Sequence, residues 1–292
     1  MPVHITSRRN GFFAEIEGVD IARGVDTSAL REIEKALDCY AVLLFRGQSL
    51  DQAQHIAFGR QLGPLEVSLL AARDGRDLSI AKEISDISNV EPDGTVTAVG
   101  DRRRMTALGN RLWHTDSSFM KVPAKYSLLY GRNVPKRGGN TEFADMRAAY
   151  DALSKTMKGR LTNLVVDHSI VHSRAVIGFA YNEKELAARP PAEQRLVRFL
   201  PGSGRMTLYL ASHASSIRGM PVPEGRMLLM ELTEHAVQRR FVHSHRWQPG
   251  DLVVWDNRAT MHRSTASDPN EIRDLHRVTV TDYASSLDQP LE

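Results

Sequence analysis

Two histidines and one aspartate of this chain can meet only in a fold that brings distant segments together. His114 and Asp116 stand two residues apart within residues 113–119, and His262 follows about half of the chain later. Side chains at positions i and i+2 of a β-strand point to the same face, so the first two can converge on one ion. Two imidazoles and one carboxylate are the ligand set of a mononuclear iron site that leaves one face of the octahedron open. Taken alone, either histidine could instead be a strand-end or core residue.

The length and composition exclude several classes of protein. The 292 residues, with 41% apolar and 25% charged side chains, are typical of a globular chain and fit one domain over residues 1–292. No apolar run is long enough to span a bilayer, and the N-terminus lacks the layout of a signal peptide. Cys39 is the only cysteine, which excludes an internal disulfide and favours the cytoplasm. The net charge of +3 is mild and the basic run at 102–104 has no aromatic partner, so we expect no nucleic-acid or membrane partner.

Helical patterns are few. Helices are expected at residues 27–40, 50–62, 146–153 and 223–237. The first is predicted by an amphipathic spacing after a cap at Asp26 or Thr27, and the second by a capping box at residues 49–52. The second helix should end at Gly63-Pro64, and Pro223 suits the first turn of the last helix.

Short strands make up most of the remaining pattern. Residues 12–21 read as a strand followed by a turn, and further strands are expected at residues 41–45, 126–130, 164–172, 196–200, 206–211, 241–247, 252–255 and 275–283. Residues 201–204 read as a hairpin turn, and residues 182–194 read as a loop because two prolines interrupt them. Many short strands with a few helices predict a mainly β barrel or sandwich with helical decoration.

Residues 65–110 have mixed polarity, several glycines and no clean periodicity. A long irregular segment inside a compact domain is typically a lid or binding loop, or else disordered. Because this segment directly precedes the His-x-Asp pair, we interpret it as a lid over the expected metal site.

Two arginines near the C-terminus indicate anionic ligands. Arg273 and Arg277 stand four residues apart in a strand-like run, so both would point to the same face. A guanidinium inside a barrel is costly unless it meets an anion, and its planar fork suits a carboxylate. We expect one carboxylate on a co-substrate and one on a substrate, unless this strand faces solvent. Thr141, after the glycines at 138–139, could donate to a ligand or be an ordinary strand threonine.

Four motifs together resemble one known family. They are Trp-His-x-Asp-x-x-Phe at 113–119, Gly-Gly-Asn-Thr-x-Phe at 138–143, Trp-Asp-Asn-Arg at 255–258 followed by His262, and Arg273 eleven residues after that histidine. With them the sequence resembles the taurine dioxygenase family of 2-oxoglutarate-dependent iron(II) dioxygenases. Phrases at 42–48, 54–58, 143–153 and 222–226 are most similar to its 2,4-dichlorophenoxyacetate dioxygenase branch.

The resemblance implies a double-stranded β-helix (jelly-roll) core and a role for nine residues. The iron ligands, and thereby the catalytic residues, would be His114, Asp116 and His262. The residues for 2-oxoglutarate would be Arg273, Thr141 and Asn110, and those for an acidic substrate would be Arg277, His213 and Ser117. The other paired histidines, at 168 and 172 and at 243 and 245, are expected to be structural or to have no metal role.

The resemblance also implies an activity. With iron(II), 2-oxoglutarate and dioxygen, the enzyme would hydroxylate an aryloxyalkanoic acid such as 2,4-dichlorophenoxyacetate, giving a phenol and glyoxylate together with succinate and carbon dioxide. The alternatives are a dioxygenase for taurine, alkylsulfonates or alkylsulfates, and a non-catalytic sensor of iron and 2-oxoglutarate. A homo-oligomer is implied as well. The chain departs from the branch at His276, where arginine is frequent, and over residues 65–110.

Overall fold

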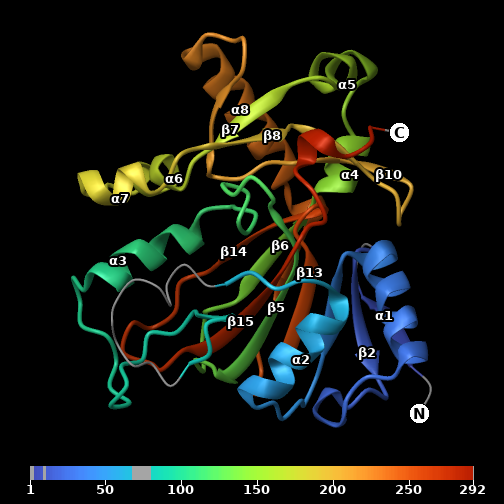
Figure 1. Cartoon of the computed structure of the whole chain (residues 1–292), viewed down its shortest axis with the longest axis vertical. Coiled ribbons are helices and arrows are strands. Elements are labelled where there is room, and N and C mark those ends of the chain that lie inside the picture. The colour runs from blue at the N-terminus through green and yellow to red at the C-terminus, as the bar shows by residue number, and fades with distance from the viewer. Residues whose placement is uncertain (1–2, 9–10, 68–79, 292) are drawn as a thin grey trace.

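The largest sheet in the described part of the protein has seven strands and lies in the lower part of Figure 1. The computed structural model describes residues 3–8, 11–67 and 80–291. In spatial order the strands are β1 (His4–Arg8), β2 (Phe13–Glu17), β3 (Val42–Phe45), β13 (Leu252–Asp256), β5 (Ala124–Asn133), β15 (Asp274–Thr281) and β4 (Ile84–Asp86). Neighbouring strands are antiparallel except for β2 and β3, which are parallel.

Two helices cover one face of this sheet (Figure 1). The first, α1 (Thr27–Tyr40), begins at Asp26 as predicted, because the Asp26 carboxylate accepts hydrogen bonds from two amides of the first turn. The second, α2 (Gln52–Leu62), ends before Gly63 as predicted. Their apolar faces share a core with alternate strand residues, among them Ile33, Leu37, Ile56, Phe58, Leu43, Phe45, Leu128, Val254 and Val278.

The other face of the main sheet packs against a second sheet. Its strands are, in spatial order, β12 (Val242–His245), β6 (Thr141–Asp145) and β14 (Thr260–Ser264). Successive strand residues point to opposite faces, so Val42 and Leu44 turn away from the helices and form a core with Phe143 of β6. The expected combination of packed β-sheets with helices is confirmed, although the helices take a larger share of the chain than the sequence suggested.

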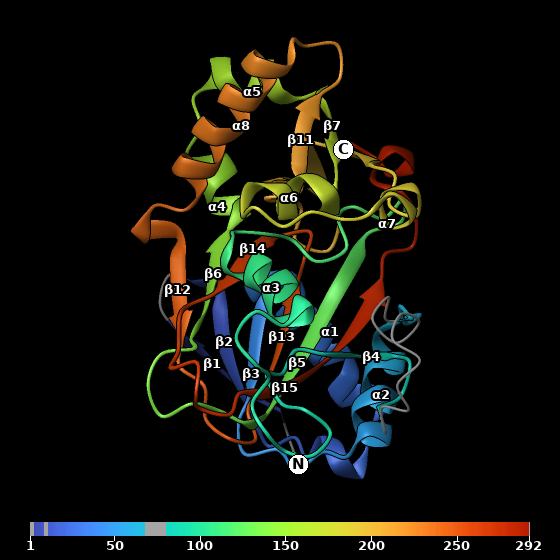
Figure 2. The ribbon, with the colours of Figure 1, turned by 90° about the vertical axis from the view of Figure 1, so that its left-hand side faces the viewer.

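A third region lies at the opposite end of the molecule from α2 (Figures 1 and 2). Its strands are β11 (Ala214–Ile217), β7 (Val165–His168) and β8 (Ala192–Arg195), together with the hairpin of β9 (Val197–Leu200) and β10 (Arg205–Leu208) that the sequence predicted. Its helices are α4 (Met146–Asp151), α5 (Lys155–Leu161), α6 (Ile170–Val176), α7 (Glu183–Ala187) and α8 (Val222–Ala236). The predicted starts of α4 at Asp145 and of α8 near Pro223 are confirmed.

The segment 65–110 is more regular than the sequence suggested. It contributes β4 to the edge of the main sheet, then α3 (Arg102–Ala107) and the 3-10 turn η3 (Leu108–Arg111). Residues 68–79 of this segment lie outside the described residues. No helix in the described ranges is both long and apolar enough to cross a membrane.

The capping box of α2 lies two residues later than predicted. Asp51, not Ser49, is the N-cap, and its carboxylate accepts from the Gln54 amide at 2.8 Å. The Gln54 side chain accepts in return from the Asp51 amide at 2.9 Å. Aspartate caps a helix as well as serine does, and the sequence 49–54 offers both starting points.

Two strand and loop predictions were wrong in part. The strand predicted at 164–172 ends at His168, because Ser169 accepts a hydrogen bond from the His172 amide and caps α6. The loop predicted at 182–194 contains α7, capped by Asn182, and most of β8. These helices are too short for their apolar periodicity to be visible in the sequence, although each has a polar cap.

Candidate active site

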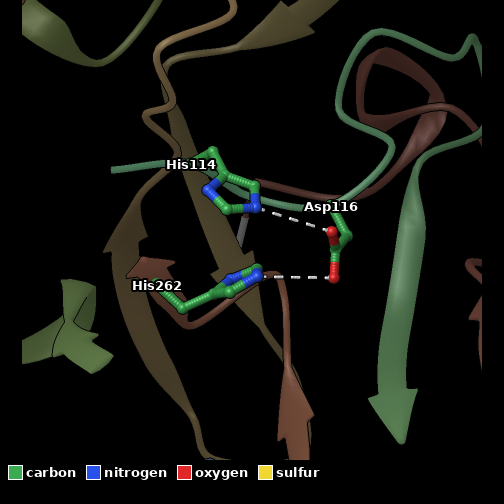
Figure 3. A group of neighbouring side chains, drawn as sticks. All are labelled: His114, Asp116 and His262. Carbon is green, nitrogen blue, oxygen red and sulfur yellow. Dashed lines mark ion pairs between the residues drawn. The ribbon is translucent and has the colours of Figure 1, made fainter. Parts of the chain in front are cut away.

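His114, Asp116 and His262 lie together, and their side chains point toward one another (Figure 3). His114 Nε2 is 3.8 Å from one carboxylate oxygen of Asp116, and His262 Nε2 is 3.6 Å from the other. All three residues are buried. The fold therefore brings together the three residues that the sequence pattern predicted to converge.

A pair of backbone hydrogen bonds holds the two histidines side by side. The His114 amide donates to the His262 carbonyl at 2.9 Å, and the His262 amide donates to the His114 carbonyl at 2.8 Å. The centroids of their rings are 4.2 Å apart. Thr115 points away, and its hydroxyl donates to the Leu210 carbonyl at 2.9 Å. This pairing attaches the His114 segment to β14.

The aspartate reaches the site by a turn and not along a regular strand. Within residues 113–119 only His114 forms a β-bridge, and Asp116 belongs to the turn that follows. The next residue, Ser117, has a φ of 50°, in the left-handed region. The prediction that His114 and Asp116 lie on one regular strand was therefore wrong, although their side chains converge as predicted.

A buried hydrogen-bond network orients the Asp116 carboxylate. Ser127, on β5, donates its hydroxyl to Asp116 Oδ2 at 2.7 Å, and Asn257 donates its amide to that hydroxyl oxygen at 2.9 Å. Asn257 Oδ1 accepts from the Asp116 amide at 3.2 Å and from the Trp255 indole at 2.9 Å. Sequence reasoning noted Asn257 only as part of a motif and did not single out Ser127, which looks like any strand serine.

The protonation states suit a metal ion. Burial alone would raise the pKa of Asp116, but the Arg277 guanidinium and the hydrogen bond from Ser127 act in the opposite direction, and that pKa lies well below its usual value. Burial lowers the pKa of His114, and burial with the nearby His114 lowers the pKa of His262 much further. His114 Nδ1 is 2.8 Å from the Leu112 carbonyl, so Nδ1 carries the proton and the Nε2 lone pair faces Asp116. One carboxylate and two neutral imidazoles are the protonation states that divalent-cation binding requires.

The predicted arginines differ in their partners. Arg277 donates a hydrogen bond to Asp116 Oδ1, and its Nε is buried without a partner. Arg273 donates to the Ile87 carbonyl at 3.3 Å and has no ion pair with any residue in the described part of the chain. Burial lowers the pKa of the Arg273 guanidinium to about 10.

The weaker candidates lie around this centre. Thr141, at the start of β6, accepts a hydrogen bond from the Trp247 indole at 3.0 Å. Asn110, in η3, accepts through its carbonyl from Ser264 of β14 at 3.3 Å. Neither side chain is hydrogen-bonded to His114, Asp116 or His262, all of which lie within the described residues.

Ser117 is hydrogen-bonded to a carboxyl group that the sequence did not reveal. That group is Glu66, whose amide also donates to the Thr279 carbonyl of β15 at 2.8 Å. Burial raises the pKa of Glu66, while Ser117 and the charge of Arg277 act in the opposite direction. Glu66 belongs to the 65–110 segment, so this segment contributes directly to the surroundings of the site.

His213 is held by a chain of three side chains. Its Nδ1 lies 2.9 Å from the Ser118 hydroxyl, and that hydroxyl lies 2.9 Å from Nδ1 of His168. A hydroxyl has one hydrogen, so Ser118 donates to one imidazole and accepts from the other. The His213 ring lies edge-on to that of His114, with 6.2 Å between centroids, and Nε2 is the nitrogen that Ser118 leaves free for a ligand.

Comparison with known proteins assigns this arrangement to a family. The model of the taurine catabolism dioxygenase TauD, TfdA family matches residues 5–279. The chain belongs to this family. The resemblance predicted from the sequence motifs is thus confirmed, and with it the class of the enzyme, a 2-oxoglutarate-dependent dioxygenase that uses iron(II).

Individual members of the family are similar over nearly their whole length. The alpha-ketoglutarate-dependent 2,4-dichlorophenoxyacetate dioxygenase of Cupriavidus pinatubonensis is 45% identical over 274 residues, covering 94% of this chain and 96% of the relative. The (S)-phenoxypropionate/alpha-ketoglutarate-dioxygenase of Sphingobium herbicidovorans is 36% identical over 90% of this chain and 89% of its own. The crystal structure of AAD-2 in complex with Mn(II) and N-oxalylglycine has a TM-score of 0.91 and 43% identity, covering 99% of this chain and 100% of that chain.

Proposed function

We propose that this dioxygenase hydroxylates an aryloxyalkanoic acid, with 2,4-dichlorophenoxyacetate as the model substrate. The observation that carries the proposal is the 45% identity, over 94% of the chain, to a 2,4-dichlorophenoxyacetate dioxygenase. It is supported by a site in which Arg277, His213 and Ser117 surround the three clustered residues. A site with several cationic and hydrogen-bonding groups suits a small organic acid.

The residues of this chain would divide the work as follows. His114, Asp116 and His262 would hold iron(II), because they offer two imidazole lone pairs and an ionised carboxylate. Arg273, which has no carboxylate partner within the described residues, would bind the distal carboxylate of 2-oxoglutarate, with Thr141 and Asn110 nearby. Arg277 would bind the acid group of the substrate, while His213 and Ser117 would complete that end of the pocket.

Iron(II) with 2-oxoglutarate supplies, when bound, the activation of dioxygen and the oxidation of a substrate C–H bond to C–OH. One oxygen atom enters the substrate, and the other enters the succinate that forms as carbon dioxide leaves. The protein positions the acid so that the carbon beside its ether oxygen is the one oxidised. The product of that step is a hemiacetal, which loses its aryloxy group as a phenol and leaves glyoxylate.

The same proposal includes the finer points of the fold. The main sheet and the β12-β6-β14 sheet face one another across a shared core, an arrangement that supports the double-stranded β-helix. The described parts of the 65–110 segment, residues 65–67 and 80–110, would form one wall of the pocket, supported by the hydrogen bond from the Arg273 amide to Asn89 at 2.8 Å and by Glu66 beside Ser117. That this wall closes over the substrate stays a prediction.

Coupled turnover by purified protein tests the proposal. Oxygen uptake, succinate and phenol are measured with iron(II), 2-oxoglutarate and ascorbate, using phenoxyacetate and 2,4-dichlorophenoxyacetate. Taurine and an alkyl sulfate are tested as alternative substrates, because an alpha-ketoglutarate-dependent sulfate ester dioxygenase of Pseudomonas putida is 28% identical to this chain. Phenol and succinate in equal amounts, dependent on 2-oxoglutarate, are expected. Turnover of the sulfur acids alone would overturn the proposal.

A further inference from the structure

Besides Arg273, which has no ion pair and is assigned above to 2-oxoglutarate, one buried arginine in the described part of the chain lacks an aspartate partner. Four arginines are buried in the described part of the chain, namely Arg147, Arg174, Arg198 and Arg258. Three of them form ion pairs: Arg147 with Asp145 at 3.4 Å, Arg198 with Asp282 at 2.6 Å and Arg258 with Asp256 at 2.7 Å. Arg174 has no carboxylate within ion-pair distance among the described residues. A buried charge without a counter-ion costs several kcal/mol by general estimates, so its retention calls for a reason.

The hydrogen bonding of the Arg174 guanidinium is also incomplete. It donates to the hydroxyl of Ser173 at 3.2 Å, while its Nε is buried without a partner. A guanidinium has five N–H donors, so most of its capacity remains for another acceptor. Burial lowers the pKa of Arg174, as expected for a cation that has lost water without gaining an anion.

Arg174 lies beside the segments that form the active site. Its guanidinium packs flat against Gly109 of η3, where an added Cβ would come within 2.3 Å of Arg174 Nη1. Gly109 therefore leaves the space that the guanidinium fills. Figure 2 shows α6, which carries Arg174, next to α3 and the segment that leads on to His114.

A second contact joins Arg174 to the His213 segment. Ser173 shares a hydrogen bond of 2.9 Å with the hydroxyl of Ser212, the residue before His213. The Ser212 amide donates to the Trp113 carbonyl, next to His114, at 2.8 Å. Arg174 is thus connected, through Ser173 and Ser212, to the segments that carry His213 and His114.

We propose that Arg174 is an anion-binding residue of the active site, which receives the carboxylate of the substrate together with His213. The inference rests on the proposed function, because an aryloxyalkanoic acid brings the missing carboxylate. The acid group can also meet Arg277, since two carboxylate oxygens offer about four acceptor positions. Arg277 already has Asp116 as a partner, whereas Arg174 has no carboxylate partner among the described residues.

Arg174→Met separates this role from a structural one. Methionine fills a similar space without charge, so the variant relieves the uncompensated cation. We expect its Tm, measured without substrate, to rise by about 2–4 °C. The matched control is Arg198→Met, which removes the 2.6 Å ion pair of the buried Asp282 carboxylate and should lower Tm while KM for the acid stays unchanged.

Steady-state kinetics on the same variants provide the second measurement. In Arg174→Met, KM for 2,4-dichlorophenoxyacetate should rise about 30-fold or more, while KM for 2-oxoglutarate changes less than about threefold. Arg174→Lys should recover part of the loss, because it keeps the charge but not the planar fork.

The outcomes are distinct. An unchanged KM for the acid would overturn the role of Arg174, and so would a lowered Tm with both KM values raised together, since that marks a structural residue. Failure of the proposed function would be visible earlier, in the unaltered protein, which would release no phenol from any of the acids.

Discussion

At the scale of single residues, the partners of a side chain say more than its type. Arg273 and Arg277 stand four residues apart, just before and within β15, yet one has no ion pair among described residues and the other donates a hydrogen bond to Asp116. Asn257 was only part of a motif in the sequence, but it is fully buried and its side chain contacts three groups around Asp116. A carboxylate that binds metal needs such outer partners to fix its orientation.

Removing the Asn257 amide should weaken metal binding. Asn257→Ala leaves the Trp255 indole and the Asp116 amide without their acceptor, and lets the Asp116 carboxylate rotate. We expect iron(II) affinity to fall about 10–100-fold, measured by anaerobic titration calorimetry. Asn140→Ala is the control, because that amide donates only to Ser244 at an exposed position. Equal affinities in both variants would contradict the role of the network.

At the scale of elements, α2 packs closely against β15 because the backbone at Gly59 of the helix lies directly against the side chain of Val278 of the strand. A Cβ added at Gly59 would lie 2.6 Å from Cγ1 of Val278 and 3.2 Å from Leu65. Valine is stiff at χ1, so the contact cannot be relieved by a rotamer change at low cost. Glycine at this helix position is thus required by packing and not by backbone conformation.

Gly59→Ala should destabilise the protein by about 1–3 kcal/mol, because overpacking outweighs the roughly 1 kcal/mol gained from helix propensity. Urea unfolding measures the change. Gly159→Ala, in α5, is the matched control: nothing lies within 4 Å of the added Cβ, so this substitution should stabilise. If Val278→Ala added to Gly59→Ala recovered no stability, the steric explanation would be wrong.

At the scale of the whole molecule, buried neutral histidines make stability depend on pH. Burial lowers the pKa of His55 and of His168 from 6.5 to about 3. The unfolded chain therefore binds protons below pH 6.5 that the folded protein does not accept until about pH 3. Stability is full above pH 6.5 and falls as the pH decreases through this window.

Below pH 6.5 the free energy of unfolding should fall by about 1.4 kcal/mol per pH unit for each such histidine. Urea unfolding of metal-free protein between pH 7 and pH 5 measures it. His55→Gln removes one titrating group but keeps a donor for the Leu128 carbonyl, which His55 Nε2 contacts at 3.1 Å. The variant should therefore show a shallower slope. If the unaltered protein and the variant showed the same dependence on pH, His55 would have the same pKa in the folded and the unfolded chain, which would contradict the prediction.

What the sequence by itself determined is chemistry and local structure. The types and spacing of His114, Asp116 and His262 predicted a metal centre, and the motifs around them predicted the family that the comparisons confirmed. Caps such as Asp26 and Asp145 marked the starts of helices. These features are readable because capping and amphipathic periodicity depend on residues a few positions apart.

Only the tertiary structure decided which of these residues touch. Pairing of His114 with His262 joins segments separated by about half of the chain, and Asp116 reaches them through a turn that strand alternation did not predict. The sequence did not single out Arg174, because only the fold buries it beside Gly109 with no carboxylate at ion-pair distance among the described residues. Burial and counter-ions are properties of packed neighbours, which only the folded chain specifies.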